Sequence, residues 1–346
     1  MLCKRLYGSL VVYPYYPLAS LRGDFVRQAM TTMAIELRAV TKTFAGLTAV
    51  DRLDLKIPRG ALYGFIGPNG AGKTTTIRMI MSILLPDSGA LSVLGHKSAL
   101  DAKDRIGYLP EERGLYRKMK VAPYLTFIAR LKGMPERGLK DRVYSMIERI
   151  GLKGVENKRC EELSKGMSQK IQILAAIIHE PALLILDEPF SGLDPVSTRL
   201  LKDMILAEHR RGATVLFSTH VMPQAEEICD HVVMIHRGHK VLDDPVRTIL
   251  GAHDSRALTF EPLDGQVDIG ALNALPEIER CIAANGHYEV ALRDGVNAAA
   301  AMRSVLAVVP AARIEMKRRS LEDVFVAIAG TEGGSSGASI GGKEAA

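Results

Sequence analysis

Two kinds of apolar patterning run along the chain from Ile35 onward. One kind is a strict alternation of apolar and polar residues, which is typical of a half-buried strand because successive side chains point to opposite faces. The other is a short continuous apolar run, which is typical of a strand buried on both faces of a parallel sheet. Together they predict strands at 35–40, 50–57, 61–66, 90–94, 183–186, 214–218 and 232–235.

Helical periodicity dominates between several of these strands, with apolar residues three or four positions apart. It extends from about Glu112 to Cys160, and a further helical run covers 171–179. The first stretch is carried by Leu125, Ile128, Ala129, Leu131, Val143, Met146, Ile147 and Ile150. Strands that alternate with helices predict an α/β domain with a mostly parallel sheet core.

The pattern changes around His253. Strands are predicted at 256–260, 277–283, 287–292 and 312–316, and helices at 297–308 and 320–329. We therefore expect a small α+β accessory domain at 254–330. The Gly- and Ser-rich residues 331–346 predict a flexible tail.

Residues 1–33 differ from the rest of the chain. They contain the run Val-Val-Tyr-Pro-Tyr-Tyr-Pro, and its prolines interrupt the apolar core that a signal peptide needs. We expect an N-terminal extension that is disordered or not native, with Met33 or Met30 as the working first residue. Association of this segment with a membrane is the alternative.

Composition narrows the classes of function. The 346 residues are 47% hydrophobic and 24% charged, and no apolar run approaches the length of about 18 residues that a membrane span requires. The formal charge of +6 is spread along the chain, which favours a solvated basic surface and no nucleic-acid partner. The cysteines form no C-x-x-C pair, so we expect unpaired thiols in a reducing cytosol and no zinc site; they are Cys3, Cys160, Cys229 and Cys281.

The strongest chemical signal directly follows the predicted strand at 61–66. Gly67 to Thr74 fits the pattern G-x-x-x-x-G-K-[ST] of a phosphate-binding loop. Its glycines allow backbone amides to turn toward an anion, and the helix that follows directs its positive dipole end at the same phosphates. Lys73 would supply charge to the β/γ-phosphates, and the Thr74 hydroxyl would ligate Mg²⁺. The predicted nucleotide contacts are Gly67, Pro68, Asn69, Gly70, Ala71, Gly72, Lys73, Thr74 and Thr75.

Acidic residues follow the buried strand at 183–186. Asp187 and Glu188 lie at its carboxyl end, where parallel sheets place their ligands. We expect Asp187 to hold Mg²⁺ through water and Glu188 to act as the general base on an attacking water. A surface acidic turn is the alternative.

A third motif, Leu163-Ser164-Lys165-Gly166-Met167-Ser168-Gln169-Lys170, precedes the helical run at 171–179. It resembles the signature loop of ATP-binding-cassette (ABC) ATPases. The resemblance implies two copies that face each other head to tail, so that Ser164 and Gly166 of one copy close over ATP held by the other. It covers residues 35 to about 329.

Other landmarks match the same family. Ser191-Gly192-Leu193-Asp194 matches the loop that crosses the dimer interface, which would bring Asp194 near the nucleotide. His220 follows the strand at 214–218 and matches the histidine that senses the γ-phosphate. Phe44 falls where the family stacks an aromatic ring on adenine, although an ordinary strand-end Phe is the alternative.

The chain departs from the common family pattern at two places. Glu111 and Glu112 follow Pro110, where the family often has glutamine. Glu111 would bring an acid close to Mg²⁺ or would stay outside its first shell. Lys165 and Met167 replace glycine and glutamine in the signature, and both changes resemble the ABC-2-type exporter branch. So do the segment 108–116 and the motif Ser320-Leu321-Glu322-Asp323-Val324-Phe325.

The resemblance implies an α/β fold class. It comprises a P-loop NTPase cassette at 34–253 with an antiparallel β-subdomain, a helical subdomain at about 112–180, and the small C-terminal α+β domain. The implied activity is ATP hydrolysis with ATP and Mg²⁺, coupled through a homodimer to a separate transmembrane permease at the inner face of the cell membrane. The permease would contact 111–120 and 121–150. A soluble ABC ATPase acting on ribosomes or DNA, or one with a regulatory or resistance role, is the alternative.

Overall fold

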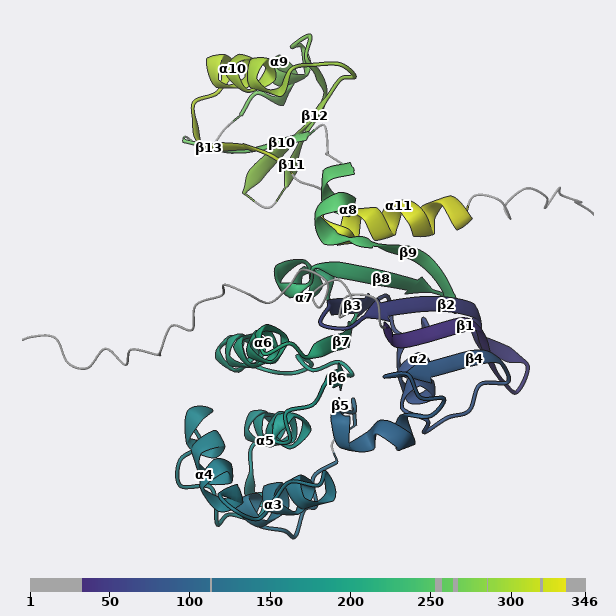
Figure 1. Cartoon of the computed structure of the whole chain (residues 1–346). Helices are drawn as coiled ribbons and strands as arrows, with labels where there is room; N and C mark the ends of the chain where they lie inside the picture. The colour runs from purple at the N-terminus through teal and green to yellow at the C-terminus, as the bar shows by residue number, and fades with distance from the viewer. Residues whose placement is uncertain are drawn as a thin grey trace, which may run out of the picture.

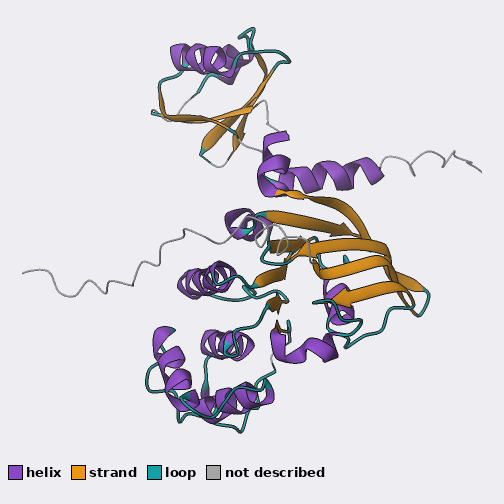
Figure 2. Ribbon diagram, in the orientation of Figure 1, coloured by secondary structure: helices purple, strands orange, loops and turns teal. Residues whose placement is uncertain are grey.

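The computed structural model describes residues 33–112, 114–252, 257–263, 267–284, 286–317 and 320–333 (Figure 1). The predictions for residues 1–32 and 334–346 lie outside these described residues. Met33 begins the first strand of the described structure. Three sheets organise the described chain, and helices cover them (Figure 2).

The central element is a six-stranded sheet with the order β5-β6-β7-β3-β8-β9. Its strands are β3 (Leu62–Ile66), β5 (Ile106–Leu109), β6 (Leu183–Leu186), β7 (Thr214–Thr219), β8 (His231–His236) and β9 (His239–Pro245). All neighbouring pairs are parallel except β8 and β9. The residues of β3, β6 and β7 are all buried, as expected for strands covered on both faces. The predicted mostly parallel core is confirmed, whereas β9 was not predicted because an edge strand tolerates charged, exposed residues.

A second sheet, with the order β2-β1-β4, is antiparallel throughout. It contains β1 (Met33–Phe44), β2 (Leu47–Pro58) and β4 (Ser88–Val93), which extend the strands predicted from the alternation. Ile35, Leu55 and other inward residues share a core with Ile77 and Ile80 of α2 (Lys73–Ile80). The helix that follows the phosphate-binding loop is therefore packed against both sheets.

The helical part of the cassette begins later than the sequence predicted. Residues 114–120 form turns and a short bridge between Lys120 and Arg159, so regular helix starts only at Val121. In contrast, the helix predicted at 171–179 begins earlier, because the Ser164 hydroxyl accepts a hydrogen bond from the Met167 N–H at 3.3 Å and caps it. The helices here and along the parallel sheet are η1 (Ala99–Arg105), α3 (Val121–Leu131), α4 (Leu139–Arg149), η2 (Cys160–Glu162), α5 (Lys165–Ile177), α6 (Pro195–Arg210), α7 (Met222–Ile228) and α8 (Val246–Ala252).

The C-terminal part contains a separate four-stranded antiparallel sheet with the order β11-β12-β10-β13. Its elements are β10 (Ala257–Pro262), α9 (Ile269–Asn273), β11 (Ile278–Ala284), β12 (His287–Leu292), α10 (Ala298–Val308) and β13 (Ala311–Met316). This βαββαβ order is the ferredoxin-like arrangement. Its core is its own and includes Leu258, Phe260, Leu272 and Val305.

The last helix, α11 (Leu321–Gly333), packs differently from the prediction that 320–329 belongs with the accessory domain. Leu321 and Val324 are buried in the core of the cassette and not in that of the ferredoxin-like sheet. The helix contacts α7, and Phe325 lies edge-to-face with His236 of β8 at a centroid distance of 5.5 Å. Figure 1 shows α11 beside α8 and above β9, apart from β10–β13. The ferredoxin-like sheet is thus an insertion between α8 and α11.

Two further observations complete the description. None of the helices within the described ranges is both long and apolar enough to cross a membrane. Cys160, Cys229 and Cys281 are all buried free thiols.

Candidate functional site

The loop between β3 and α2 has a backbone that only glycine can supply at two positions. Gly67 has φ +149°, and a Cβ there would lie 2.2 Å from the carbonyl oxygen of Ile235. Gly72 has φ +108°, and a Cβ there would lie 2.5 Å from the carbonyl oxygen of Ala49. The sequence therefore folds as a tight loop whose amides precede the first turn of α2, which is a suitable site for an anion.

The loop lines a cleft of about 220 Å³. Its walls are Ala49, Asn69, Gly70, Ala71, Gly72, Lys73, Thr74, Thr75, Glu111 and Glu188. The structure thus brings together most of the predicted phosphate contacts with two acidic residues from distant parts of the chain. Gly67 and Pro68 contact the cleft indirectly, since their carbonyl oxygens accept hydrogen bonds from the Lys73 ammonium at 2.7 and 3.1 Å.

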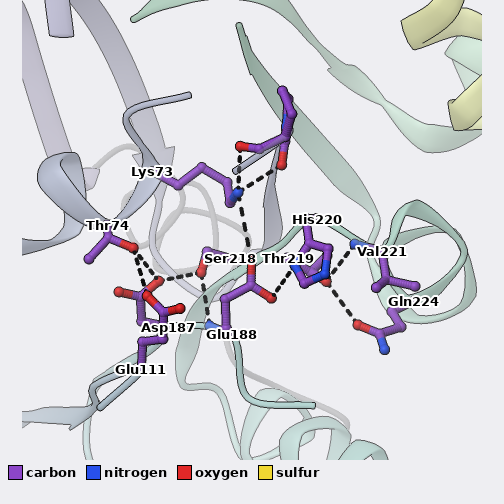
Figure 3. A network of polar contacts seen from close by, with 12 residues as sticks. Lys73, Thr74, Glu111, Asp187, Glu188, Ser218, Thr219, His220, Val221 and Gln224 are labelled. Atoms are coloured by element: carbon purple, nitrogen blue, oxygen red, sulfur yellow. Dashed lines mark hydrogen bonds and ion pairs between the residues drawn. The ribbon is translucent and has the colours of Figure 1, made fainter. Parts of the chain in front are cut away.

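Lys73, Glu188 and His220 form a continuous polar contact (Figure 3). The Lys73 Nζ lies 3.7 Å from Glu188 Oε1, and His220 Nδ1 lies 3.0 Å from Glu188 Oε2. Burial lowers the pKa of Lys73, and the neighbouring carboxylates of Glu188 and Asp187 oppose that shift. A buried ammonium of this kind gains strongly from an additional anion such as a phosphate.

Asp187 lies next to the hydroxyl of Thr74 at the edge of the cleft. Thr74 Oγ1 is 3.3 Å from Asp187 Oδ1 and 3.4 Å from Glu111 Oε2. Burial raises the pKa of Asp187, although hydrogen bonds from Ser218 and Thr74 offset part of the rise. Asp187 Oδ2 is buried and has no hydrogen-bond partner. A hydroxyl with two nearby carboxylates, one of which has an unpartnered oxygen, fits the hard oxygen ligands that Mg²⁺ prefers.

The predicted dimer-facing residues lie outside this cleft. Ser164 caps α5, and Gly166 lies on the first turn of that helix. Asp194 caps α6 and accepts hydrogen bonds from both the N–H and the hydroxyl of Ser197, which lower its pKa. A Cβ on Gly166 would lie 3.9 Å from Asp194 Oδ2, so the signature and the 191–194 loop are neighbours. Gly166 and Asp194 are thus neighbours, and none of Ser164, Gly166 and Asp194 lines the cleft of the phosphate-binding loop.

Phe44 ends β1 in a hairpin whose second strand supplies Ala49 to the cleft. Its side chain is 44% exposed, and the Lys42 ammonium lies 5.5 Å from the ring centroid. The ring is therefore accessible to solvent, as stacking on a base would require, and it belongs to the same hairpin as Ala49.

Three side chains take part in the site in ways that the sequence did not predict. Ser218 on β7 is completely buried and contacts both Asp187 and Glu188. Gln169 on α5 donates a hydrogen bond to the carbonyl of Pro189, which follows Glu188. Lys165 lines a small cavity of about 60 Å³ with Glu111, Asp187 and Glu188. The sequence signals for these residues are the signature motif, which contains Lys165 and Gln169, and the predicted strand end at which Ser218 lies.

Comparisons with known proteins agree with this geometry. The family described as ABC transporter matches residues 50–191. The ABC transporter ATP-binding protein YhaQ of Bacillus subtilis is 45% identical over 225 residues, which cover 65% of this chain and 76% of YhaQ. The Nod factor export ATP-binding protein I of a Rhizobium species is 33% identical over 228 residues, covering 65% of this chain and 75% of that protein.

A solved structure also matches. It is that of an ATP-binding subunit of an ABC transporter, with a TM-score of 0.59 and 30% identity, covering 64% of this chain and 93% of the solved chain. The family match covers the phosphate-binding loop and the acidic residues Asp187 and Glu188. The chain belongs to the ATP-binding subunits of ABC transporters and is an ATPase.

Proposed function

We propose that this subunit powers export by a cycle of MgATP binding, head-to-tail dimerisation, hydrolysis and separation, and that it passes the work to a separate permease. ATP binding and work with membrane permeases are properties of the family; the exporter assignment, the Mg²⁺, the dimer and the location at the inner face of the cell membrane are the proposal. The observation that carries it is the contact of one carboxylate, Glu188, with both Lys73 and His220.

The chemistry follows from the two oxygens of Glu188. Oε2 contacts His220, whereas Oε1 is buried without a hydrogen-bond partner and faces the Lys73 ammonium. Oε1 is thus free to take a proton from a water that attacks the γ-phosphate. Lys73 would hold the β/γ-phosphates, and His220 would orient Glu188 and sense the γ-phosphate. Mg²⁺, held by Thr74, Asp187 and a water shared with Glu111, would neutralise charge on the phosphates.

The position of the signature supports a dimer. Ser164 and Gly166 lie beside Asp194 and not in the cleft of their own chain, so a second copy is needed to bring them to the nucleotide. Val196, on the first turn of α6 next to Asp194, is 77% exposed, which fits a surface that another chain covers.

An aromatic cluster supports the permease contact predicted at 111–120 and 121–150. Tyr116 is 55% exposed and lies edge-to-face with Tyr124 and Phe127 of α3, at centroid distances of 6.0 and 5.9 Å. Aromatic side chains are enriched where proteins bind one another. Because the cluster follows Glu111 in the chain, a partner seated on it could respond to the nucleotide.

The export assignment rests on the resemblance to the ABC-2-type branch and on the export role for which the Rhizobium relative is named. Purification of the full-length chain from the membranes of its own cells tests the export assignment, because an exporter subunit should co-purify with a permease of the export type.

Two substitutions test the catalytic assignment. Lys73→Ala should abolish ATP binding or turnover, because it removes the buried cation of the loop. Glu188→Gln should keep ATP binding and lower turnover by about 10²- to 10⁴-fold, the usual contribution of a general base. It should also accumulate an ATP-loaded dimer, measured by light scattering after size exclusion. Glu188→Gln turnover at the wild-type rate would refute the role of the base, and a monomer under these conditions would refute the dimer.

A further inference from the structure

The hydroxyl of Ser218 lies between the two acidic residues of the site. Ser218 follows Phe217, which pairs with Leu186 in the last registered position of β7 and β6. The residue after Phe217 in β7 is Ser218, and the residue after Leu186, directly beyond the end of β6, is Asp187. The two therefore lie next to each other. The side chain of Ser218 is fully buried, so its hydrogen bonds are made to protein groups and not to bulk water.

Both bonds of this hydroxyl can be assigned without ambiguity. The backbone N–H of Glu188 can only donate, and it reaches Ser218 Oγ at 2.9 Å. The single hydroxyl proton then goes to Asp187 Oδ1, 2.5 Å away (Figure 3). A short hydrogen bond to a carboxylate is the stronger, charge-assisted kind. Ser218 thus holds Oδ1 of Asp187, whereas Oδ2 is buried and has no hydrogen-bond partner.

The second bond acts on the backbone of Glu188. That residue has φ +49°, a left-handed conformation that is unfavourable for a residue other than glycine. The bond from its N–H to Ser218 stabilises this conformation. The same conformation directs the side chain of Glu188 toward Lys73 and His220.

We propose that Ser218 is a positioning residue that fixes Asp187 and Glu188 relative to each other. Its single hydroxyl would position both the carboxylate of Asp187 that holds the metal and the carboxylate of Glu188 that takes a proton from the attacking water. This inference rests on the proposed function, because it assigns a role to Ser218 through the roles of Asp187 and Glu188. Ser218 does not line the cleft itself and touches the substrate through neither of its bonds.

A matched control exists on the same strand. Thr214, the first residue of β7, is also buried, and its hydroxyl also accepts a backbone N–H, that of Gly60 at 2.9 Å. It lies at the end of β7 opposite to the cleft. Thr214→Val removes that hydroxyl with little change of shape, so it reproduces the structural part of a Ser218→Ala substitution without touching the acidic pair.

The test uses the full-length chain and three measurements: kcat and KM for ATP, the Mg²⁺ concentration that half-saturates the binding of a fluorescent ATP analogue, and the melting temperature. For Ser218→Ala we expect kcat to fall about 10- to 100-fold and the half-saturating Mg²⁺ concentration to rise about 10-fold, the usual effect of losing a supporting hydrogen bond to a metal ligand. KM for ATP should stay within about twofold, because the phosphate-binding loop is unchanged.

Two variants complete the design. Thr214→Val should keep kcat and the Mg²⁺ dependence within about twofold of the wild type, even if its melting temperature falls as far as that of Ser218→Ala. Ser218→Thr keeps the hydroxyl and should recover most of the lost rate. If Ser218→Ala fails to fold, Ser218→Cys makes the same comparison, since a thiol keeps the shape but is a weak donor.

Three results would overturn the inference. In the first, Ser218→Ala (or Ser218→Cys) has the same kcat and Mg²⁺ dependence as the wild type. In the second, Thr214→Val loses as much kcat as Ser218→Ala. In the third, Ser218→Ala changes only the KM for ATP. If Ser218→Ala hydrolyses ATP at the wild-type rate while Glu188→Gln is inactive, only the role of Ser218 is refuted. A wild-type rate in Glu188→Gln would sink the proposed catalytic base itself.

Discussion

The C-terminal helix α11 should contribute to the stability of the cassette, although it follows the ferredoxin-like sheet in the chain. Leu321 is 0% exposed and lies in the same apolar core as α7 and the parallel sheet. Replacing a fully buried leucine by alanine costs about 2 to 5 kcal/mol, part from lost burial and part from the cavity that remains. We therefore expect Leu321→Ala to lower the free energy of unfolding of the cassette by about 3 kcal/mol. For a domain of this size that corresponds to a melting temperature about 6 to 12 °C lower.

The assay must report the cassette specifically. Because the chain contains no tryptophan, unfolding is best followed by far-ultraviolet circular dichroism together with loss of binding of a fluorescent ATP analogue. Leu272→Ala is the matched control, since Leu272 is equally buried but in the core of the ferredoxin-like sheet. Val326→Ala, at a site on α11 that is 63% exposed, should change stability by less than about 0.5 kcal/mol.

The two buried leucines should then give opposite patterns. Leu321→Ala should lower the denaturant concentration at which half of the analogue binding is lost, whereas Leu272→Ala should leave that concentration unchanged. If Leu321→Ala leaves the loss of analogue binding unmoved, α11 does not belong to the cassette, and the packing described here is refuted. A deletion designed to remove the ferredoxin-like sheet alone should therefore keep residues 320–333, because they include α11.

Two further predictions concern the loop and the pH dependence of stability. Gly72→Ala should weaken binding of the ATP analogue at least about 100-fold, because the new Cβ would meet a backbone carbonyl. Gly70 has φ +77° and open space around it, so Gly70→Ala should weaken binding only about tenfold, through backbone strain. Equal losses of affinity in the two variants would contradict this. Burial lowers the pKa of His179 from 6.5 to about 4, so its contribution to stability is present above pH 6.5 and is lost as the pH falls toward 4. Allowing for partial exposure, the loss is on the order of 2 kcal/mol, and His179→Gln should remove this part of the slope in denaturant titrations; an unchanged slope would contradict it.

The parts of the fold that the sequence predicted well are those set by local rules. The loop at Gly67–Thr74 needs left-handed backbone at fixed positions, and only glycine supplies it there, so the residue pattern and the geometry coincide. The buried runs that became β6 and β7 are equally direct, since a strand covered on both faces has no reason to carry polar residues. The fold class and the family follow from these elements, and both are confirmed.

The features that the sequence did not predict depend on residues far apart in the chain. The packing of α11 on α7 joins segments separated by the whole ferredoxin-like sheet, and a helical pattern alone does not say which core its apolar side enters. The early start of α5 depends on one side-chain cap at Ser164. The roles assigned to Glu188, His220 and Asp194 stay predictions, because geometry brings the first two together and leaves the third beside the signature without testing what any of them does.

The strand order of the parallel sheet explains why the site assembles where it does. In the order β6-β7-β3, the middle strand lies between β6, which directly precedes Asp187, and β3, which leads to the loop with Lys73. A residue at the carboxyl end of β7 therefore lies beside the two acidic residues that follow β6, whatever its identity. At Ser218 the position must accept one N–H and donate to one carboxylate, and a hydroxyl does both. Alanine would leave the buried N–H of Glu188 unpaired, at about 1 to 3 kcal/mol, and would leave Asp187 Oδ1 with only the longer contact to Thr74 at 3.3 Å. The strand order thus requires, at this position, a small side chain that both accepts and donates a hydrogen bond, and serine satisfies this requirement. The same requirement should apply at the corresponding strand end of other parallel sheets that carry two adjacent acidic residues.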